Sequence, residues 1–265
     1  MKCGLIGEGF VGSALRKSME LKGVEVFSYD KYKKIGSFEL ALNNGVIFMC
    51  LPTPFIVETG YDLSPIEENL SKLSKANYEG VVVIKSTTNI GTCKTLSEKY
   101  NLKICHNPEF LTERTAFEDF HNQKHIVIGY DKSKKDLSEL YSMYSDNYNA
   151  KINTCSTMES ESMKLFCNNF YAQKIMIFNE YYSLCKKLNI DYNNVKSLML
   201  ENNWINEMHT VVPGPDGKMA YGGNCFPKDT MALLKQMIDE GSIHMMLKSC
   251  VEERDSIRND KPNVI

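Results

Sequence analysis

Gly7-Glu8-Gly9-Phe10-Val11-Gly12 lies between an apolar run of strand length, Cys3–Ile6, and a helix-periodic segment, Phe10–Lys22. In a strand–loop–helix unit with this spacing, the first glycine allows a tight turn and the second lets a pyrophosphate approach the backbone. The third lets the helix pack on the strand. Free N–H groups at the start of the helix favour phosphate. The stretch therefore predicts a dinucleotide-binding loop, and its candidate cofactor-binding residues are Gly7, Gly9, Phe10, Val11 and Gly12.

An acidic residue follows the second expected strand. Val24–Tyr29 alternates as a strand, and Asp30 comes 18 residues after Gly12, close to the offset of a ribose-binding acid. A carboxylate accepts a hydrogen bond from a ribose 2′-hydroxyl but repels a 2′-phosphate, so Asp30 favours NAD over NADP. Three lysines within the next four residues weaken that preference slightly. The alternative interpretation is a glycine-rich turn followed by a solvated aspartate.

The first half of the chain alternates between strand and helix patterns. Further strands are expected at Val46–Leu51, Val81–Ile84, Lys103–His106 and His125–Gly129. Helices are expected at Phe38–Asn43 and at Ser64–Ala76, where Ser64 and Glu67 have the spacing of a capping box and Pro65 occupies the first helical position. This alternation predicts an α/β domain, a Rossmann-type doubly wound parallel sheet.

Near residue 150 the pattern becomes helical. Met158–Leu188 has helical periodicity and contains neither proline nor glycine. Shorter helices are expected at Asp191–Leu200, from Pro227 onward, and at Ser242–Asn259. We therefore expect residues 1–150 to form an NAD-binding Rossmann domain. Residues 151–265 are expected to form an all-helical dimerisation and catalytic domain with a long central helix.

Composition excludes several other classes of protein. Hydrophobic residues make up 43% of the chain and charged residues 24%, which is ordinary for a globular protein. The net charge of −2 gives no electrostatic reason to expect nucleic acid or an anionic membrane. No run approaches the ~18 apolar residues of a membrane span, and the N-terminus lacks the apolar core of a signal peptide. Nine cysteines without a Cys-x-x-Cys pair indicate reduced thiols in a cytoplasmic protein and no metal site.

One cysteine has the setting of a nucleophile. In Tyr221–Asp229 two glycines precede Cys225, and Pro227 is a favoured first helical residue, so Cys225 is expected just before a helix. The positive end of that helix and the adjacent Lys228 should both stabilise a thiolate. Asp229, four residues on, is expected within reach of the thiol or of a water beside it. The alternative, a buried structural cysteine, is the better interpretation of the other eight.

Lys164 and Asn168 lie four residues apart on the long expected helix and therefore share a face. Such a pair can hold an oxyanion or sugar hydroxyls. Spacing alone favours the alternative, an ordinary solvated helix surface.

Together these stretches resemble the UDP-glucose/GDP-mannose dehydrogenase family over nearly the whole chain. The most specific segments are the cysteine box, Gly222–Asp229, and the stretch Asn107–Leu111, which continues to Glu113. Further matching segments are Leu51–Pro54, Lys85–Thr87, Ile90–Thr92, Glu118–Phe120 and Ile126–Gly129.

The resemblance implies oxidation of a sugar nucleotide at C6, from alcohol to carboxylate, with two NAD per turnover. UDP-glucose to UDP-glucuronate, in polysaccharide biosynthesis, is the expected reaction. Cys225 would be the nucleophile that forms a thiohemiacetal and then a thioester, while Lys164 steadies the oxyanion. Asp229 and Thr87 would position water, and Glu113 would assist proton transfer.

The resemblance also implies the binding residues. Substrate contacts would come from Glu109, Phe110, Leu111, Lys164, Asn168 and Gly222. Further cofactor contacts would come from Thr53, Thr87, Glu113 and Lys228.

The chain also departs from the family pattern. Full-length members carry a third, nucleotide-gripping domain, and we expect this chain to be a short form without it. The nucleotide would then be held by a dimer partner, or the substrate would differ, or affinity would be poor. Thr112 stands where the family often has arginine, and Pro213–Lys218 is lengthened. One alternative hypothesis is the same chemistry on GDP-mannose or a UDP-N-acetylhexosamine. Another is a non-catalytic NAD-binding protein with a vestigial site.

A homodimer is the expected assembly. In the family the long helix lies at the dimer interface, and here its apolar residues exceed one core-facing stripe. They are Met163, Phe166, Phe170, Tyr171, Ile175, Phe178 and Leu184. The alternative is that the closing helix, Ser242–Asn259, covers the second apolar face within one chain.

Overall fold

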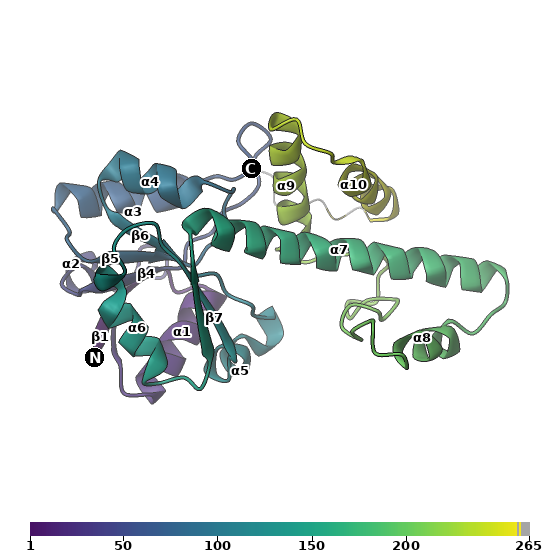
Figure 1. Cartoon of the computed structure of the whole chain (residues 1–265), viewed down its shortest axis with the longest axis horizontal. Helices are drawn as coiled ribbons and strands as arrows, with labels where there is room; N and C mark the ends of the chain where they lie inside the picture. Colours follow the sequence, from purple (N-terminus) through teal and green to yellow (C-terminus); the bar gives the residue numbers. More distant parts are fainter. Residues whose placement is uncertain (259, 261–265) are drawn as a thin grey trace. The chain divides into compact units, whose positions relative to one another are not determined.

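The computed structural model describes residues 1–258 and 260 and divides into two compact units. The first unit comprises Met1–Thr53 and Asp62–Lys164. The second comprises Pro54–Tyr61 and the described residues from Leu165 onward. Figure 1 labels elements of both units.

An eight-stranded sheet forms the centre of the first unit, in the order β3-β2-β1-β4-β5-β6-β7-β8. Its strands are β1 (Lys2–Ile6), β2 (Glu25–Asp30), β3 (Ile35–Gly36), β4 (Val46–Met49), β5 (Val81–Ile84), β6 (Lys103–His106), β7 (His125–Gly129) and β8 (Lys151–Cys155). Every residue of β4 and β5 is buried, as expected when helices cover both faces of a parallel sheet.

Helices cover both faces of this sheet. They are α1 (Phe10–Leu21), α2 (Phe38–Leu42), α3 (Ser64–Lys75), α4 (Thr92–Tyr100), α5 (Ala116–His121) and α6 (Ser138–Ser145). Side chains of α1, α5 and α6 share one apolar core with the strands. Side chains of α3 and α4 share a second core with alternate strand residues. The doubly wound class predicted from the sequence is confirmed.

The sheet is mixed, whereas the sequence pattern predicted a parallel one. β2 and β3 are antiparallel because the short turn between them returns the chain directly beside β2. β6 and β7 are also antiparallel, through the single pairing of His106 with Gly129. The final strand, β8, was not anticipated, since three of its five residues are polar and it has neither strict alternation nor a continuous apolar run.

The capping box expected at the start of α3 is wrong. The helix begins at Ser64, one residue earlier than the capping pattern requires, and its N-cap is Leu63, which makes no side-chain capping bond. Instead, the side chain of Asp62 accepts a hydrogen bond from the Ser64 N–H at 2.9 Å. Pro65 lies in the first turn, where its missing N–H costs nothing.

The second unit is helical, as predicted. α7 (Thr157–Lys187) begins in the first unit and continues as the first helix of the second. It is followed by α8 (Tyr192–Leu200), α9 (Phe226–Asp239) and α10 (Met245–Ile257) (Figure 1). Asp191 caps α8 by accepting from the Asn193 N–H at 2.9 Å. The expected last helix extended to Asn259, which lies outside the described residues.

Two small apolar cores hold the second unit together. One packs Ala172 and Met176 of α7 against Tyr221 of the following loop and Cys250 of α10. The other joins α7 to α8 and the loop after it, where the rings of Tyr182 and Tyr192 meet edge to face at 5.3 Å.

None of the helices among the described residues is both long and apolar enough to cross a bilayer. All nine cysteines lie in the described part of the chain, and each is a free thiol. Burial raises the pKa of Cys3 and of Cys250 to about 12, so these two thiols are protonated at neutral pH.

Candidate active site

The glycine loop has the geometry of a phosphate cradle. Gly7 has a φ of +97°, and a Cβ there would collide with the carbonyl oxygen of Cys50. A Cβ at Gly12 would collide with the carbonyl oxygen of Gly7, so the third glycine lets α1 approach the loop. At Gly9, the N-cap of α1, a Cβ would meet nothing within 4 Å. Open space therefore faces the free N–H groups of the helix, which suits a pyrophosphate.

This loop lies where the strand order of the sheet reverses. β1 pairs in parallel with β2 on one side and with β4 on the other. Ligands of doubly wound sheets bind at the carboxyl ends of strands at such a switch point. Phe10 and Val11, the first two residues of α1, are exposed and half-buried there.

Asp30, the predicted ribose-binding acid, is tied to the glycine loop. Its Oδ2 accepts the Glu8 N–H at 2.8 Å, and its Oδ1 accepts the N–H groups of Tyr32 and Lys33 at 3.0 and 2.8 Å. Partial burial raises the pKa of Asp30, but the three backbone hydrogen bonds outweigh it and hold the pKa below its ordinary value. The carboxylate is ionised, and its remaining lone pair, on Oδ2, can accept from a ribose hydroxyl.

Glu8 was not singled out from the sequence. Its side chain is buried, and its carboxylate lies 2.7 Å from Nε of Arg16 and 3.1 Å from the Ser13 hydroxyl. The salt bridge neutralises an acid that would otherwise repel phosphate at the start of α1.

The loops after β4 and β5 are joined by side-chain hydrogen bonds. Thr53 donates to the carbonyl oxygen of Thr87 at 2.8 Å, and Ser86 donates to that of Leu51 at 2.6 Å. Thr53 and Thr87 are both buried. These bonds fix two of the candidate residues at the same edge of the sheet as the glycine loop.

Lys164 and Glu109 form a nearly buried ion pair within the first unit. Lys164 Nζ donates to the Glu109 carbonyl oxygen at 2.7 Å and lies 3.1 Å from its carboxylate. The other carboxylate oxygen accepts the Leu111 N–H at 2.6 Å. Nζ is also 5.5 Å from the ring centre of Phe110. A fixed cation therefore lies against the segment expected to hold the substrate.

A second buried lysine, Lys85, also binds this segment, and no role was predicted for it from the sequence. Lys85 donates to the carbonyl and side-chain oxygens of Asn107, both at 2.9 Å. Tyr144 donates to the same side-chain oxygen at 2.5 Å. Burial lowers the pKa of Lys85 to about 8. This network anchors the start of the segment that carries Glu109.

Glu161, one turn before Lys164 on α7, is another residue missed from the sequence. Its carboxylate accepts the backbone N–H groups of Gly91 and Cys93 at 2.6 and 2.7 Å. It thereby caps α4 and fixes the loop that carries Thr87. Burial raises the pKa of Glu161 despite these hydrogen bonds.

Glu113 opens the short 3-10 turn Glu113–Thr115 and is exposed. The Asp119 carboxylate steadies this turn by accepting from the Thr112 N–H at 2.9 Å and the Thr115 hydroxyl at 2.8 Å.

In the second unit the cysteine box has the predicted form. Cys225 is the N-cap of α9 and is half-buried, and Pro227 lies in the first turn. Asp229, one turn on, is fully buried and donates its N–H to the Cys225 carbonyl oxygen at 3.0 Å. Its carboxylate accepts from Asn168 Nδ2 at 2.7 Å and from Lys228 Nζ at 2.6 Å. Four predicted residues thus meet at the start of one helix.

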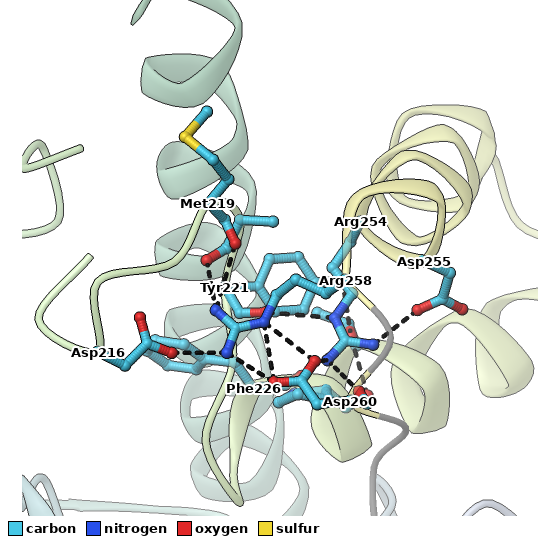
Figure 2. A network of polar contacts seen from close by, with 11 residues as sticks. Asp216, Met219, Tyr221, Phe226, Arg254, Asp255, Arg258 and Asp260 are labelled. Atoms are coloured by element: carbon cyan, nitrogen blue, oxygen red, sulfur yellow. Dashed lines mark hydrogen bonds and ion pairs between the residues drawn. The ribbon is translucent and has the colours of Figure 1, made fainter. Parts of the chain in front are cut away.

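Two buried arginines at the end of the chain hold the loop that leads to Cys225 (Figure 2). Arg258 donates to the carbonyl oxygens of Met219 and Ala220, both at 3.2 Å, and Arg254 donates to that of Tyr221 at 3.2 Å. Both arginines also bind the Asp260 carboxylate.

Gly222 lies against this network. A Cβ there would collide with the guanidinium of Arg258. Arg258 also binds Asp216 at 2.6 Å, which fixes the far end of the lengthened loop. Neither arginine was predicted from the sequence, because the carbonyl oxygens that they bind lie 33 to 39 residues earlier in the chain.

Fold and glycine loop define a dinucleotide-binding Rossmann protein with an attached helical unit. Residues 37–146 match the profile "UDP-glucose/GDP-mannose dehydrogenase family, NAD binding domain", and residues 158–255 match the central domain of the same family. The chain belongs to the UDP-glucose/GDP-mannose dehydrogenase family, and its first matched domain indicates NAD as the cofactor.

Individual relatives agree with this assignment. UDP-glucose 6-dehydrogenase of Rickettsia bellii is 32% identical over 232 residues, which cover 83% of this chain and 52% of the relative. The enzyme of the same name from Campylobacter jejuni is 29% identical, over 86% of this chain and 59% of the relative. The chain thus spans between half and three fifths of the length of these relatives.

Solved structures share the fold. UDP-glucose dehydrogenase from Pyrobaculum islandicum superposes with a TM-score of 0.85 at 24% identity, covering 96% of this chain and 68% of that one. A Mycobacterium tuberculosis 3-hydroxyisobutyrate dehydrogenase superposes with a TM-score of 0.77 at 13% identity, covering 99% of this chain and 95% of that one.

Proposed function

We propose that this protein oxidises the C6 alcohol of a sugar nucleotide to a carboxylate with NAD, acting on UDP-glucose to give UDP-glucuronate. One observation carries the proposal: Cys225 caps a helix whose next turn holds the buried Asp229 carboxylate, bound by Asn168 and Lys228. A partly exposed thiol at a positive helix end, beside a fixed carboxylate, suits covalent catalysis followed by hydrolysis.

The residues of the first unit fit NAD. The N–H groups at Gly9 and the start of α1 would hold the pyrophosphate, and Asp30 would accept from the adenosine ribose. NAD would supply the hydride acceptor for both oxidations, with a fresh molecule bound for each. Thr53, fixed by Thr87, would lie by the cofactor.

The chain's own groups would handle the remaining chemistry. After the first hydride leaves C6 and the hydroxyl proton is lost, the Cys225 thiolate adds to the aldehyde to form a thiohemiacetal. Loss of the second hydride leaves a thioester. Water, oriented by Asp229 and Thr87, then adds to the thioester carbonyl, and expulsion of the Cys225 sulfur frees the carboxylate.

Lys164 would stabilise the oxyanion that forms at each addition, since it is a buried cation whose position the Glu109 carbonyl oxygen fixes. Glu113 would assist the proton transfers of hydrolysis. The segment Glu109–Leu111, Asn168 and Gly222 would contact the sugar nucleotide.

The first test is NADH formation by the purified chain with a panel of UDP- and GDP-sugars. UDP-glucose should give the highest kcat/KM. Higher activity with GDP-mannose or a UDP-N-acetylhexosamine would support the same oxidation on a different substrate. NAD binding without turnover of any sugar nucleotide would support the non-catalytic alternative.

The second test concerns the thiol. Cys225→Ala should abolish carboxylate formation, and Cys225→Ser should slow it and leave a covalent ester adduct. Cys167→Ala, at a half-buried cysteine of α7, is the matched control and should keep full activity. Unchanged turnover in the Cys225 variant would remove this residue from the mechanism.

We further propose that the protein is a homodimer that pairs through α7. Five of the exposed apolar side chains on this helix, together with Leu188 directly after it, form one stripe: Phe166, Phe170, Ile177, Tyr181, Leu184 and Leu188. Successive helical residues are rotated by about 100°, which places all six within about 60° of one another around the axis. They stay exposed with α10 in place, so α10 does not cover this stripe. A two-fold axis would let it pack on its own copy.

Light scattering tests the assembly. The native chain should have twice the mass of one copy at micromolar concentration. Phe170→Glu should lower the measured mass to that of a single copy. Ile243→Glu, at an exposed residue outside the stripe, is the control and should leave the dimer intact. A monomeric native chain would contradict the proposal.

We expect the protein to act in the cytoplasm, where its free thiols stay reduced.

A further inference from the structure

The Asp229 carboxylate has a third donor that the family resemblance did not supply. Tyr61 donates its hydroxyl to Oδ1 of Asp229 at 2.6 Å. Lys228 binds the same oxygen at 2.6 Å, and Asn168 binds Oδ2 at 2.7 Å. Asp229 is fully buried, so these donors restrict its carboxylate to one orientation.

Tyr61 comes from a distant part of the chain. It ends the segment Pro54–Tyr61, which clusters with the second unit although it lies 168 residues before Asp229. Its side chain is almost fully buried, and Nζ of Lys228 lies 4.9 Å from its ring centre. The Thr59 hydroxyl donates to the Tyr61 carbonyl oxygen at 3.0 Å and steadies the segment.

The direction of the Tyr61–Asp229 hydrogen bond follows from the chemistry. Burial, and then the negative charge of Asp229, raise the pKa of Tyr61 well above its ordinary value. The phenol therefore keeps its proton and can only donate to the carboxylate. Cys225, the N-cap of the helix that carries Asp229, adds a smaller rise to the same pKa.

We propose that Tyr61 is a positioning residue for Asp229: its hydroxyl holds the carboxylate in the orientation that directs water onto the Cys225 thioester. This inference rests on the proposed function. Tyr61 and Lys228 occupy both positions on Oδ1 and Asn168 occupies one on Oδ2, and the one that remains on Oδ2 is available to water. Without the phenol, the carboxylate can turn about its side-chain bonds toward Lys228, and water is no longer directed.

The alternative is that Tyr61 only anchors its own segment. Anchoring would affect stability, or all catalytic steps together. Positioning of Asp229 affects hydrolysis alone, because both hydride transfers and the attack of Cys225 precede the step that uses the water. The two roles therefore differ in which step slows.

The test uses Tyr61→Phe, which removes one oxygen and keeps the ring, in the full chain. Tyr192→Phe is the matched control, because Tyr192 is buried in the same unit and donates to the Thr210 carbonyl oxygen at 2.6 Å. NADH formation with UDP-glucose is followed in the first turnover and at steady state. Intact-protein mass spectrometry of acid-quenched samples detects a covalent adduct. All reactions are run at a temperature where both variants are folded.

For Tyr61→Phe we expect a first-turnover burst of NADH as fast as in the native chain. Steady-state kcat should fall by roughly tenfold or more, the size of a positioning effect. A thioester adduct should accumulate on Cys225, and the control should behave as the native chain does. A kcat within about twofold of the native value, or an equal loss of burst and steady-state rates, would overturn the proposal.

A stability measurement separates this proposal from the proposed function. Urea unfolding of Tyr61→Phe, Asp229→Asn and the double variant should show strong non-additivity, because the two side chains share one buried bond. Additive effects would overturn the Tyr61–Asp229 coupling. A native chain that oxidises no sugar nucleotide would refute the proposed function, and the hydrolytic role with it, while the coupling would still be measured.

Discussion

Lys164 and Glu109 are joined twice: the lysine Nζ lies 2.7 Å from the main-chain oxygen of Glu109 and 3.1 Å from its carboxylate. The carboxylate neutralises a cation that is almost fully buried, and the carbonyl fixes where that cation lies. The pair thus links the long helix to the segment expected to contact substrate. The position of the lysine is therefore fixed before an oxyanion forms, and the site needs no reorganisation to meet it.

Breaking this pair should be costly. Lys164→Met and Glu109→Gln should each lower the free energy of unfolding by about 3 kcal/mol, since each leaves the other charge buried alone. The double variant should lose less than the sum of the two. Chemical denaturation measures all three.

The control for this prediction is Lys99→Met. Lys99 pairs with Glu67 at 2.9 Å, a similar distance, but on the surface, and such pairs contribute at most about 1 kcal/mol. Strictly additive effects at Lys164 and Glu109 would contradict the coupling. Both of these variants should also lose turnover.

Asp30 should set the choice of cofactor. Its carboxylate is held by three backbone N–H groups and can still accept from a ribose. NAD should therefore bind more tightly than NADP by roughly tenfold or more. Calorimetry with both cofactors measures this ratio, and Asp30→Asn should reduce it by removing the charge that repels a 2′-phosphate. Equal affinities in the native chain would mean that Asp30 does not meet the ribose.

The parts of the site that follow from local chemistry could be predicted from the sequence. The spacing of Gly7, Gly9 and Gly12 after an apolar run determines a strand–loop–helix unit by itself. Pro227 likewise indicates the helix start that Cys225 caps. The strand–loop–helix unit and this helix start each depend on residues close together in the sequence. The structure contains both.

The supporting residues could not be predicted in this way. Lys85 meets Asn107 across 22 residues, Glu161 reaches Cys93 across 68, and Tyr61 reaches Asp229 across 168. Their patterns are those of an ordinary lysine, glutamate and tyrosine. Only the fold, which brings strand ends and helix starts together, gives these residues partners.

Gly222 should tolerate no side chain. A Cβ there would collide with the Arg258 guanidinium, which binds the carbonyl oxygens of Met219 and Ala220. Gly222→Ala should lower the free energy of unfolding by about 1–3 kcal/mol. It should also lower kcat, because the loop before Cys225 loses its hydrogen bonds to Arg258. Thermal unfolding and NADH formation measure the two effects.

Gly223→Ala serves as the comparison for Gly222. Gly223 has a φ of +78° but open space around it, so that variant isolates backbone strain from the collision with Arg258. In the double variant Gly222→Ala with Arg258→Gln, the loss of unfolding free energy should be little more than the loss in Arg258→Gln alone. A fully additive double variant would show that the arginine is not what excludes a side chain at Gly222.

Acid should destabilise the protein through His106. This side chain is fully buried at the end of β6, and its Nδ1 lies 2.8 Å from the Ser160 hydroxyl. Burial lowers the pKa of His106 from the ordinary 6.5 to about 3. Above pH 6.5 neither the folded nor the unfolded state carries the proton, so this residue adds no pH dependence. Below that value the unfolded chain takes up a proton that the folded chain refuses.

The free energy of unfolding should therefore fall by up to about 1.4 kcal/mol for each pH unit below the ordinary histidine pKa, until about pH 3. Urea unfolding between about pH 7 and pH 5 measures this slope above the range where most carboxylates titrate. His106→Asn can keep the hydrogen bond to Ser160 without a titrating ring, so its slope in this range should be smaller. Asn179→Ala, at a buried residue that does not titrate, is the control and should keep the native slope. An equal slope in the native chain and in His106→Asn would show that His106 is not the group that acid protonates on unfolding.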